Sequence, residues 1–178
     1  RVLEEAQGIK QLASQGQNEL AGVLRLGVIY TIGPYLLPYL IPRLHRRAPE
    51  MPLQIEESYT ATLSERLKAG ELDVLILSLP FVEPGIATLP VYEEPFVVLM
   101  PLGHALEQAA VIDAPTLAQQ DLLLLGSGHC FRDQVLRFCP ECNRSSMQKT
   151  LEGSSLETIR LMVATGIGVT VLPYTSAS

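Results

Sequence analysis

Segments patterned like β-strands alternate with segments patterned like α-helices along most of this chain. The first series predicts a strand at 23–29, a helix at 33–47, a strand at 53–57, a helix at 61–69 and a strand at 73–77. Because this order is typical of crossover connections, it predicts a parallel sheet with helices on both faces. Pro34, Pro38 and Pro42 fall four residues apart in the first helix. An interior proline removes a backbone hydrogen bond, so we expect a kink or a late start there.

The pattern changes after this first series. Two strand-like pieces, 86–91 and 96–100, meet at residues 92–94, where we expect a hinge. Beyond the hinge the sequence predicts a helix at 115–119, a strand at 122–125, a helix from Cys130, a strand at 149–152, a helix at 155–165 and a strand at 169–172. Gly166 and Gly168 leave a helix and enter a strand, so they predict a helix end rather than a nucleotide-binding turn, which leads from a strand into a helix.

We therefore expect an α/β fold with two Rossmann-like lobes joined by a hinge, the first over residues 20–92 and the second over residues 93–178. A crevice between two lobes is a common ligand site. Residues 1–19 have apolar side chains at helical spacing on one narrow face, which predicts the end of a linker helix. The chain begins at Arg1 without a methionine and stops at Ser178 just after an apolar run. We expect a piece of a longer protein whose second lobe is incomplete at its C-terminal end.

Composition narrows the class of protein. The 178 residues are 47% hydrophobic and 18% charged, which is typical of a folded chain rather than a disordered one. Lys and Arg number 13 against 19 Asp and Glu, and the net charge of -6 argues against direct binding of nucleic-acid phosphates. No apolar run approaches the roughly 18 residues of a membrane-spanning helix. Three cysteines do not make a disulfide framework, so we expect a cytoplasmic protein with reduced thiols.

The segment GSGHCFRDQVLRFCPEC, residues 126–142, holds the three cysteines. It follows a predicted strand and starts a helix, so Cys130 lies at or near a helix N-terminus, where unpaired amide hydrogens favour a thiolate. His129 and Arg132 are close enough in sequence to add positive charge. A buried structural cysteine is the commoner case for this residue type, but the polar neighbours argue against an apolar core. We therefore predict a reactive thiol at Cys130.

The spacing of Cys130 and Cys139 indicates a conformational change. Phe131 and Val135 mark an amphipathic helix between them, and nine helical residues rise about 13.5 Å while turning roughly 900°. The two cysteine side chains then point to opposite faces, whereas a disulfide needs Cα atoms roughly 4.4 to 6.8 Å apart. A bond between these cysteines would require the helix to unravel, which is the behaviour of a switch rather than of a structural disulfide.

Cys139 and Cys142 form a C-x-x-C pair. With Cys130 and His129 they offer four zinc ligands, but zinc usually takes two separated pairs, and here the second pair would be two adjacent residues. A thioredoxin-like site would place Cys139 at the start of a helix, whereas Cys139 falls at a helix end. Cys142 is then either a second resolving thiol or a bystander.

Two threonines follow predicted strands at the carboxyl edge of the first sheet, which is the ligand edge of open α/β sheets. Thr31 follows the first strand and Thr60 follows the second. We expect their hydroxyl groups to converge on the crevice between the lobes. Helix capping explains threonine at these positions equally well.

Two stretches of residues 24–79, GPYLLPYLIPRLHRRAPEMPLQIEE and LSERLKAGELDVLIL, resemble the effector domain of LysR-type bacterial transcriptional regulators. GHCFRDQ, the FC whose cysteine lies nine residues after the first, and SLETIRLMVATGIGVTVLP resemble the hydrogen-peroxide-sensing branch of that family. The resemblance covers nearly the whole chain. It implies a type II periplasmic-binding-protein-like fold and a regulator of transcription rather than an enzyme.

By this resemblance Cys130 would be the cysteine that reacts with hydrogen peroxide and becomes a sulfenic acid, and Cys139 would resolve it as a disulfide. The family's motif requires no cysteine at the position of Cys142, so the choice between Cys139 and Cys142 as resolving thiol stays open. Local refolding around residues 130–142 would change the oligomer and the activity of a transcription activator.

Four further residues, Thr31, Thr60, His129 and Asp133, match positions that surround and assist the peroxide-binding pocket in the family. An acid or a hydroxyl group within hydrogen-bond reach can hold peroxide and protonate its departing hydroxide. The resemblance implies no cofactor and no metal.

The partners that the resemblance implies are hydrogen peroxide, further copies of the chain in a homodimer or homotetramer, a thiol reductant and RNA polymerase. DNA would be bound only through an N-terminal winged helix-turn-helix domain that is absent from these residues. Three alternatives stay open: a LysR-type domain that binds a small metabolite in the crevice, a thiol peroxidase, and a zinc-binding module that uses Cys130, Cys139 and Cys142.

Overall fold

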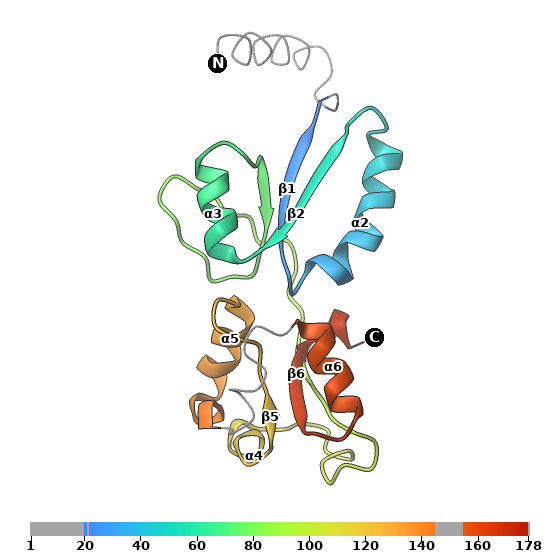
Figure 1. Cartoon of the computed structure of the whole chain (residues 1–178), viewed down its shortest axis with the longest axis vertical. Helices are drawn as coiled ribbons and strands as arrows, with labels where there is room; N and C mark the ends of the chain where they lie inside the picture. Colours follow the sequence, from blue (N-terminus) through green and yellow to red (C-terminus); the bar gives the residue numbers. More distant parts are fainter. Residues whose placement is uncertain (1–19, 21, 145–154, 178) are drawn as a thin grey trace. The chain divides into compact units, whose positions relative to one another are not determined.

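The computed structural model describes residue 20 and residues 22–144 and 155–177 (Figure 1). The helix predicted at 1–19 and the strand predicted at 149–152 lie outside these residues. In the part of the chain that is described, no helix is both long enough and apolar enough to cross a membrane.

Contacts divide the described chain into two compact units. The first unit runs to Leu77, and the second begins at Ser78 and also includes Tyr59–Ala61. The expected boundary after Tyr92 differs from this division, because residues 78–92 group with the second unit.

The helices and strands lie close to the predicted ones (Figure 1). Up to Leu77 the chain forms β1 (Leu24–Ile29), α2 (Gly33–Arg47), β2 (Leu53–Ser58), α3 (Thr60–Lys68) and β3 (Val74–Ile76). After it come β4 (Phe96–Leu99), α4 (Ala114–Ala118), β5 (Leu122–Leu123), α5 (Cys130–Phe138), η1 (Pro140–Arg144), α6 (Leu156–Ala164), β6 (Val169–Pro173) and η3 (Tyr174–Ser176). The α/β alternation predicted from the hydrophobic pattern is confirmed.

β1 is the central strand of the first unit's sheet. It pairs in parallel with β2 on one side and with β3 on the other, and its residues Leu26, Val28 and Ile29 are buried. The chain steps from β1 through α2 to β2, and then through α3 back across β1 to β3. Because crossovers between parallel strands are right-handed, these opposite steps place α2 and α3 on opposite faces of the sheet, as Figure 1 shows. The predicted parallel sheet with a helix on each face is confirmed.

Helix α2 begins at Gly33 and continues through Pro38 and Pro42 to Arg47, so of the two expectations the late start is wrong and the kink stays a prediction. Pro34 occupies the first turn, where the missing N–H removes no helical hydrogen bond. Pro34, Pro38 and Pro42 are all exposed. Residues four apart lie on one side of a helix, so the three prolines share the exposed side of α2.

β6 is the central strand of the second unit's sheet, parallel to β5 and antiparallel to β4. Both β5 and β6 are buried along their whole length. The strand-like piece expected at 86–91 is wrong, because this segment is a loop in which Leu89 and Val91 are each 84% exposed. An apolar run forms a strand only beside a neighbouring strand, and Pro90 has no N–H to donate to one.

Two glycines set the path from α6 into β6. Gly166 has a φ of +88° and ends the helix, as predicted. Gly168 lies so close to Asp121 that a Cβ at this position would overlap the Asp121 carbonyl oxygen. That oxygen accepts a hydrogen bond from the Val169 N–H at 3.0 Å, so the close approach belongs to the entry into β6.

We expect Gly168→Ala to lower the free energy of unfolding by about 1–3 kcal/mol, because a methyl group beside the Asp121 carbonyl must displace β6. Gly166→Ala is the matched control. Among the described residues nothing lies within 4 Å of a Cβ at Gly166, so only the left-handed backbone is strained, at a cost of about 1 kcal/mol. Urea unfolding measures both variants, and equal losses of stability would contradict the steric argument.

Candidate functional site

Helix α5 separates Cys130 from Cys139. Cys130 is its first residue, and Cys139 caps its C-terminal end by donating its backbone N–H to the Val135 carbonyl at 2.9 Å. The amphipathic helix predicted between the two cysteines is therefore confirmed. Because nine helical residues rise about 13.5 Å, Cys130 and Cys139 cannot bond to each other while α5 is intact.

Two apolar side chains pack α5 against the rest of the second unit. Phe131 and Val135 are 5% and 0% exposed, and the Phe131 ring meets the Phe96 ring of β4 edge to face with centroids 5.1 Å apart. Phe138, in the last turn, is 57% exposed and lines a hollow of about 200 Å³ together with Val135 and β4. In the last turn of α5 the Phe138 side chain thus buries less of its surface than Phe131 and Val135 do.

Gln134 is a further anchor of α5 that the sequence analysis missed. Its side-chain amide donates hydrogen bonds to the Ser78 hydroxyl and to the Leu79 carbonyl, both at 2.8 Å. These bonds tie the helix to the segment at which the second unit begins. The sequence carries a signal for this role, because Gln134 lies beside Val135 and three residues after Phe131, on the buried side of the helix.

Arg132 joins the first turn of α5 to its surroundings. Its guanidinium donates to the Leu125 carbonyl at 2.9 Å and to the Asn143 side-chain oxygen at 3.0 Å. Leu125 follows β5, and Asn143 lies in η1 beside Cys142. Arg132 was expected to add charge near Cys130, and these hydrogen bonds give it a structural role as well.

His129 precedes Cys130 and is the N-cap residue of α5. Its side chain is 7% exposed, and its ring meets the Tyr59 ring edge to face with centroids 4.9 Å apart. Burial lowers the pKa of His129, because it removes the charged imidazolium from water. The expectation that His129 adds positive charge is therefore wrong, since the neutral ring predominates at neutral pH.

The Tyr59 contact brings the start of α3 beside the start of α5. Thr60, the first residue of α3, follows Tyr59, just as Cys130 follows His129. Gly128 has a φ of +95°, and a Cβ there would lie 3.3 Å from the Tyr59 ring, so a side chain at this position would be both strained and crowded. Thr60 and Cys130, far apart in sequence, are thereby brought into one neighbourhood of the second unit.

Two hydroxyl groups of α3, Thr60 Oγ1 and Ser64 Oγ, are buried without a hydrogen-bond partner among the described residues. A buried hydroxyl without a partner costs free energy, so most such groups in proteins find a partner in the chain, in water or in a ligand. Thr60 Oγ1 is the more informative of the two, because Thr60 lies beside the Cys130 segment.

The other two predicted pocket residues, Thr31 and Asp133, belong to different units. Thr31 is 5% exposed and follows β1 in the first unit. Asp133 is exposed, in the first turn of α5 in the second unit. The expected convergence of the Thr31 and Thr60 hydroxyls stays a prediction.

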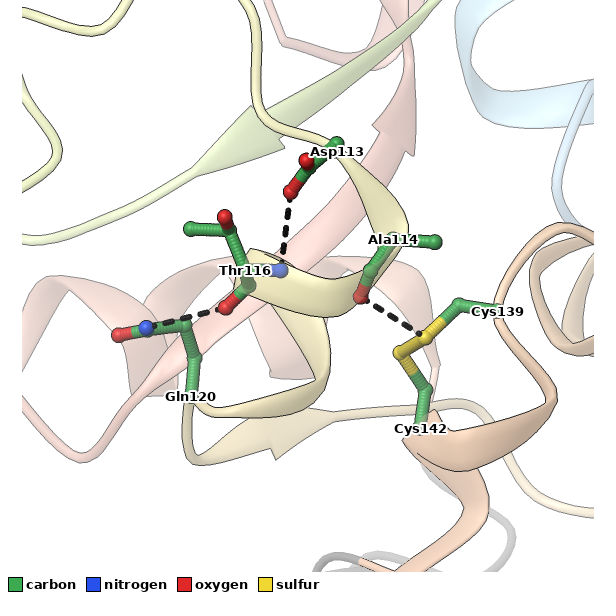
Figure 2. Close-up of a disulfide and its surroundings, with 6 residues drawn as sticks. All are labelled: Asp113, Ala114, Thr116, Gln120, Cys139 and Cys142. Carbon is green, nitrogen blue, oxygen red and sulfur yellow. Dashed lines mark hydrogen bonds between the residues drawn. A yellow bond between two sulfur atoms is a disulfide. The ribbon is translucent and has the colours of Figure 1, made fainter.

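Cys139 and Cys142 are joined by a disulfide, as Figure 2 shows, and Cys130 is a free, partly exposed thiol. The Cα atoms of the pair are 5.4 Å apart, and the Cys142 N–H donates to the Cys139 carbonyl at 3.1 Å. The expectation of reduced thiols is therefore wrong for Cys139 and Cys142. The physical reason is that a C-x-x-C turn brings its two sulfurs together without any change in α5.

The disulfide packs beside α4 (Figure 2). The Ala114 carbonyl oxygen lies 3.5 Å from Cys139 Sγ. A thiol at Cys139 would donate its hydrogen to this oxygen, whereas a disulfide sulfur has no hydrogen to donate. Asp113 caps α4 by accepting a hydrogen bond from the Thr116 N–H at 2.9 Å, and hydrogen bonding to Thr116 lowers the pKa of Asp113.

No three His, Cys, Asp or Glu side chains gather as a metal site in residues 20, 22–144 and 155–177. Cys139 and Cys142 cannot act as zinc thiolates while they are bonded to each other. The zinc-binding alternative therefore finds no support in the described part of the chain.

Residues 17–178 match the family model of the LysR substrate binding domain. The chain belongs to the LysR substrate-binding domain family. The match confirms the resemblance that the sequence motifs indicated. It also confirms the fold class, an α/β fold with two Rossmann-like lobes of the type II periplasmic-binding-protein kind.

Members of the LysR family are similar over nearly the whole chain. A probable hydrogen peroxide-inducible genes activator from Streptomyces viridosporus is 41% identical over 175 residues, which cover 98% of this chain and 56% of the relative. The reduced form of the OxyR regulatory domain from Pseudomonas aeruginosa is 55% identical, with a TM-score of 0.82 over 89% of this chain and 76% of that one. A hydrogen-peroxide-bound OxyR mutant from Corynebacterium glutamicum is 30% identical, with a TM-score of 0.83 over 97% of this chain and 54% of that one. The chain thus spans about half the length of the curated relatives that it matches.

We expect the free energy of unfolding to fall as the pH is lowered from about 7 to about 5.5. The pKa of His129 is lowered in the folded chain, whereas an unfolded histidine titrates near about 6.5, so the unfolded state takes up the proton first. The stability is therefore complete above about pH 6.5 and is lost as the pH falls toward the lowered pKa. Urea unfolding at several pH values in this range measures the slope.

Two substitutions separate the contribution of His129 to the pH dependence of stability from that of another histidine. His129→Gln should remove most of the slope between about pH 7 and about 5.5. His45→Gln, at an exposed position of α2, should keep it. An unchanged slope in His129→Gln would contradict the assignment of the pH dependence to burial of this ring.

Proposed function

We propose that this chain is the regulatory domain of a LysR-type transcription regulator that senses hydrogen peroxide through Cys130. One observation carries the proposal: a free, partly exposed thiol lies at the first residue of α5, beside the segment that holds the buried Thr60 hydroxyl. The relatives support it, because one is called a probable hydrogen peroxide-inducible genes activator and another is an OxyR mutant with hydrogen peroxide bound.

Cys130 supplies the nucleophile in the proposed reaction. Its thiolate attacks one oxygen of hydrogen peroxide, the O–O bond breaks, and the other oxygen leaves as hydroxide and takes up a proton to become water. The sulfur is left as a sulfenic acid. The start of a helix favours negative charge, and both the thiolate and the departing hydroxide carry it.

Four side chains are proposed to hold the peroxide and to supply the proton. The Thr60 hydroxyl can donate to or accept from a peroxide oxygen, which would give this buried group a partner. The neutral His129 ring has one donor and one acceptor nitrogen, so it can pass a proton. Thr31 and Asp133 are assigned to the pocket by the family resemblance.

Cys139 is proposed to resolve the sulfenic acid. Its thiol attacks the Cys130 sulfur, an S–S bond forms, and the sulfenic oxygen leaves as water. Because the nine residues of α5 separate the two sulfurs, the helix must unravel first. Unravelling would release Phe131, Val135 and Gln134 from their contacts with the rest of the second unit.

The refolded segment is proposed to change how copies of the chain assemble as a homodimer or homotetramer. DNA would be bound by a separate domain of the whole protein, since a net charge of -6 disfavours contact with phosphates. A thiol reductant would reset the disulfide, and RNA polymerase would respond to the altered assembly. Oxidation is stoichiometric in this scheme, so the domain would act as a sensor rather than as an enzyme. Its proposed location is the cytoplasm.

One equivalent of hydrogen peroxide added to the fully reduced chain should produce a disulfide that contains Cys130. Cys130→Ser should not form it, because serine cannot become a sulfenic acid. Alkylation of the free thiols followed by mass spectrometry maps the products, and hydrogen exchange of residues 130–138 should speed up as α5 unravels. If Cys130 stays a free thiol under this treatment, the proposal fails and a small metabolite becomes the better candidate ligand.

Thr60→Val should slow the oxidation of Cys130 at least about tenfold, because valine keeps the shape of the side chain but cannot hydrogen-bond to peroxide. The free energy of unfolding should stay equal or rise, since the lost hydroxyl has no partner among the described residues. Ser64→Ala is the matched control, as it removes the other such hydroxyl one turn further along α3 and should leave the rate unchanged. Timed thiol trapping measures the rates, and a normal rate in Thr60→Val would remove Thr60 from the pocket.

A further inference from the structure

We propose that Cys142 is a third redox-active thiol, which takes Cys139 out of the Cys130–Cys139 disulfide and thereby ends the signal. This inference rests on the proposed function, because it starts from that disulfide. The observation that carries it is the coexistence of the Cys139–Cys142 disulfide, a complete α5 and a free thiol at Cys130. Cys139 can therefore be oxidised while the helix that bears the sensor cysteine is intact.

The proposed step is a thiol–disulfide exchange. The Cys142 thiolate, formed by loss of its proton to water, attacks the Cys139 sulfur. The bond between Cys139 and Cys142 forms as the bond between Cys139 and Cys130 breaks. Cys130 leaves with the electron pair of the broken bond and takes up a proton, so it becomes a thiol again. One disulfide is present before and after the exchange, so the exchange itself needs no oxidant. Hydrogen peroxide is consumed only earlier, when Cys130 is oxidised.

The geometry favours the bond from Cys139 to Cys142 over the bond from Cys139 to Cys130. The first pair is three residues apart, with Cα atoms at 5.4 Å, and the Cys142 N–H already donates to the Cys139 carbonyl at 3.1 Å. The second pair lies at opposite ends of a nine-residue helix that must unravel. Moving the disulfide to Cys142 lets α5 form again.

The contacts of α5 supply the driving force for the exchange. Phe131 and Val135 are 5% and 0% exposed in the intact helix. Gln134 donates to Ser78 and Leu79, each at 2.8 Å. All of these contacts depend on helical spacing, so they would be lost in the Cys130–Cys139 form and recovered when Cys130 is released.

Cys142 is positioned to reach Cys139 in both forms. The sequence separation of three residues keeps the two sulfurs close whether α5 is helical or extended. While α5 is intact, Arg132 also ties the turn that carries Cys142 to the end of β5, through its hydrogen bonds to Leu125 and Asn143. The Cys142 thiol therefore stays near the Cys139 sulfur before and after α5 unravels.

The exchange leaves Cys130 reduced and Cys139 blocked. A second peroxide molecule could oxidise Cys130, but no Cys139 thiol would then resolve the sulfenic acid. Cys139 and Cys142 are 0% and 2% exposed, so an external thiol reductant reaches their disulfide only slowly. The signal is thus limited in time, and the protein stays refractory until that disulfide is reduced.

The test is a time course of disulfide mapping on the fully reduced chain after one equivalent of hydrogen peroxide. Cys130–Cys139 should appear first and Cys139–Cys142 later, while hydrogen exchange of residues 130–138 speeds up and then slows again. In Cys142→Ser and Cys142→Ala the Cys130–Cys139 bond should persist at least about tenfold longer. Glu141→Gln alters the same turn and keeps every sulfur, so it should behave as the wild type.

Cys130→Ser tests whether the Cys139–Cys142 bond forms by way of the Cys130–Cys139 disulfide. Without Cys130, the Cys139–Cys142 bond should form at least about tenfold more slowly. An unchanged lifetime of Cys130–Cys139 in both Cys142 variants overturns the inference, as does undiminished formation of Cys139–Cys142 in Cys130→Ser. Either result leaves the proposed function standing, because Cys130 is still oxidised in the wild type. A Cys130 that stays a thiol in every variant that retains it overturns both.

Discussion

Helix α5 holds Cys130 and Cys139 at its opposite ends, and the chemistry of the second unit depends on this separation. A nine-residue helix is marginal in water, so its stability comes from tertiary contacts. Burial of Phe131 and Val135 contributes about 1.5–3 kcal/mol for each side chain, and Gln134 adds two hydrogen bonds. These contacts keep the two sulfurs apart, and the proposed switch requires that a disulfide between them outweigh the few side chains that hold the helix.

The neighbourhood of Cys130 is assembled from segments that are distant in sequence. The edge-to-face contact of Tyr59 with His129 joins the residue before α3 to the residue before α5. The same burial keeps the His129 ring neutral, so the site relies on helix ends and hydroxyl groups for polarity rather than on an imidazolium charge. The buried Thr60 hydroxyl, which has no hydrogen-bond partner in the described part of the chain, is the feature of this neighbourhood on which the proposed peroxide pocket rests.

In the proposed scheme Cys139 takes part in two disulfides that differ in their structural requirements. Its bond to Cys142 is compatible with an intact α5, whereas a bond to Cys130 is not. Because one sulfur makes only one such bond, the third cysteine introduces a competition that a two-cysteine switch does not have. The outcome depends on how strongly the second unit holds α5.

Much of the local structure follows from the sequence by itself. Hydrophobic periodicity determined the strands and helices, including the helix that begins at Cys130, because each helix or strand is specified by residues close together in the chain. The motifs likewise identified the family. Only the tertiary structure decided that residues 86–91 form a loop, that His129 is buried and neutral, that Gln134 anchors α5, and that Cys139 bonds to Cys142. Burial, pKa and strand pairing depend on neighbours that folding brings together, and the sequence pattern alone does not specify which neighbours those are.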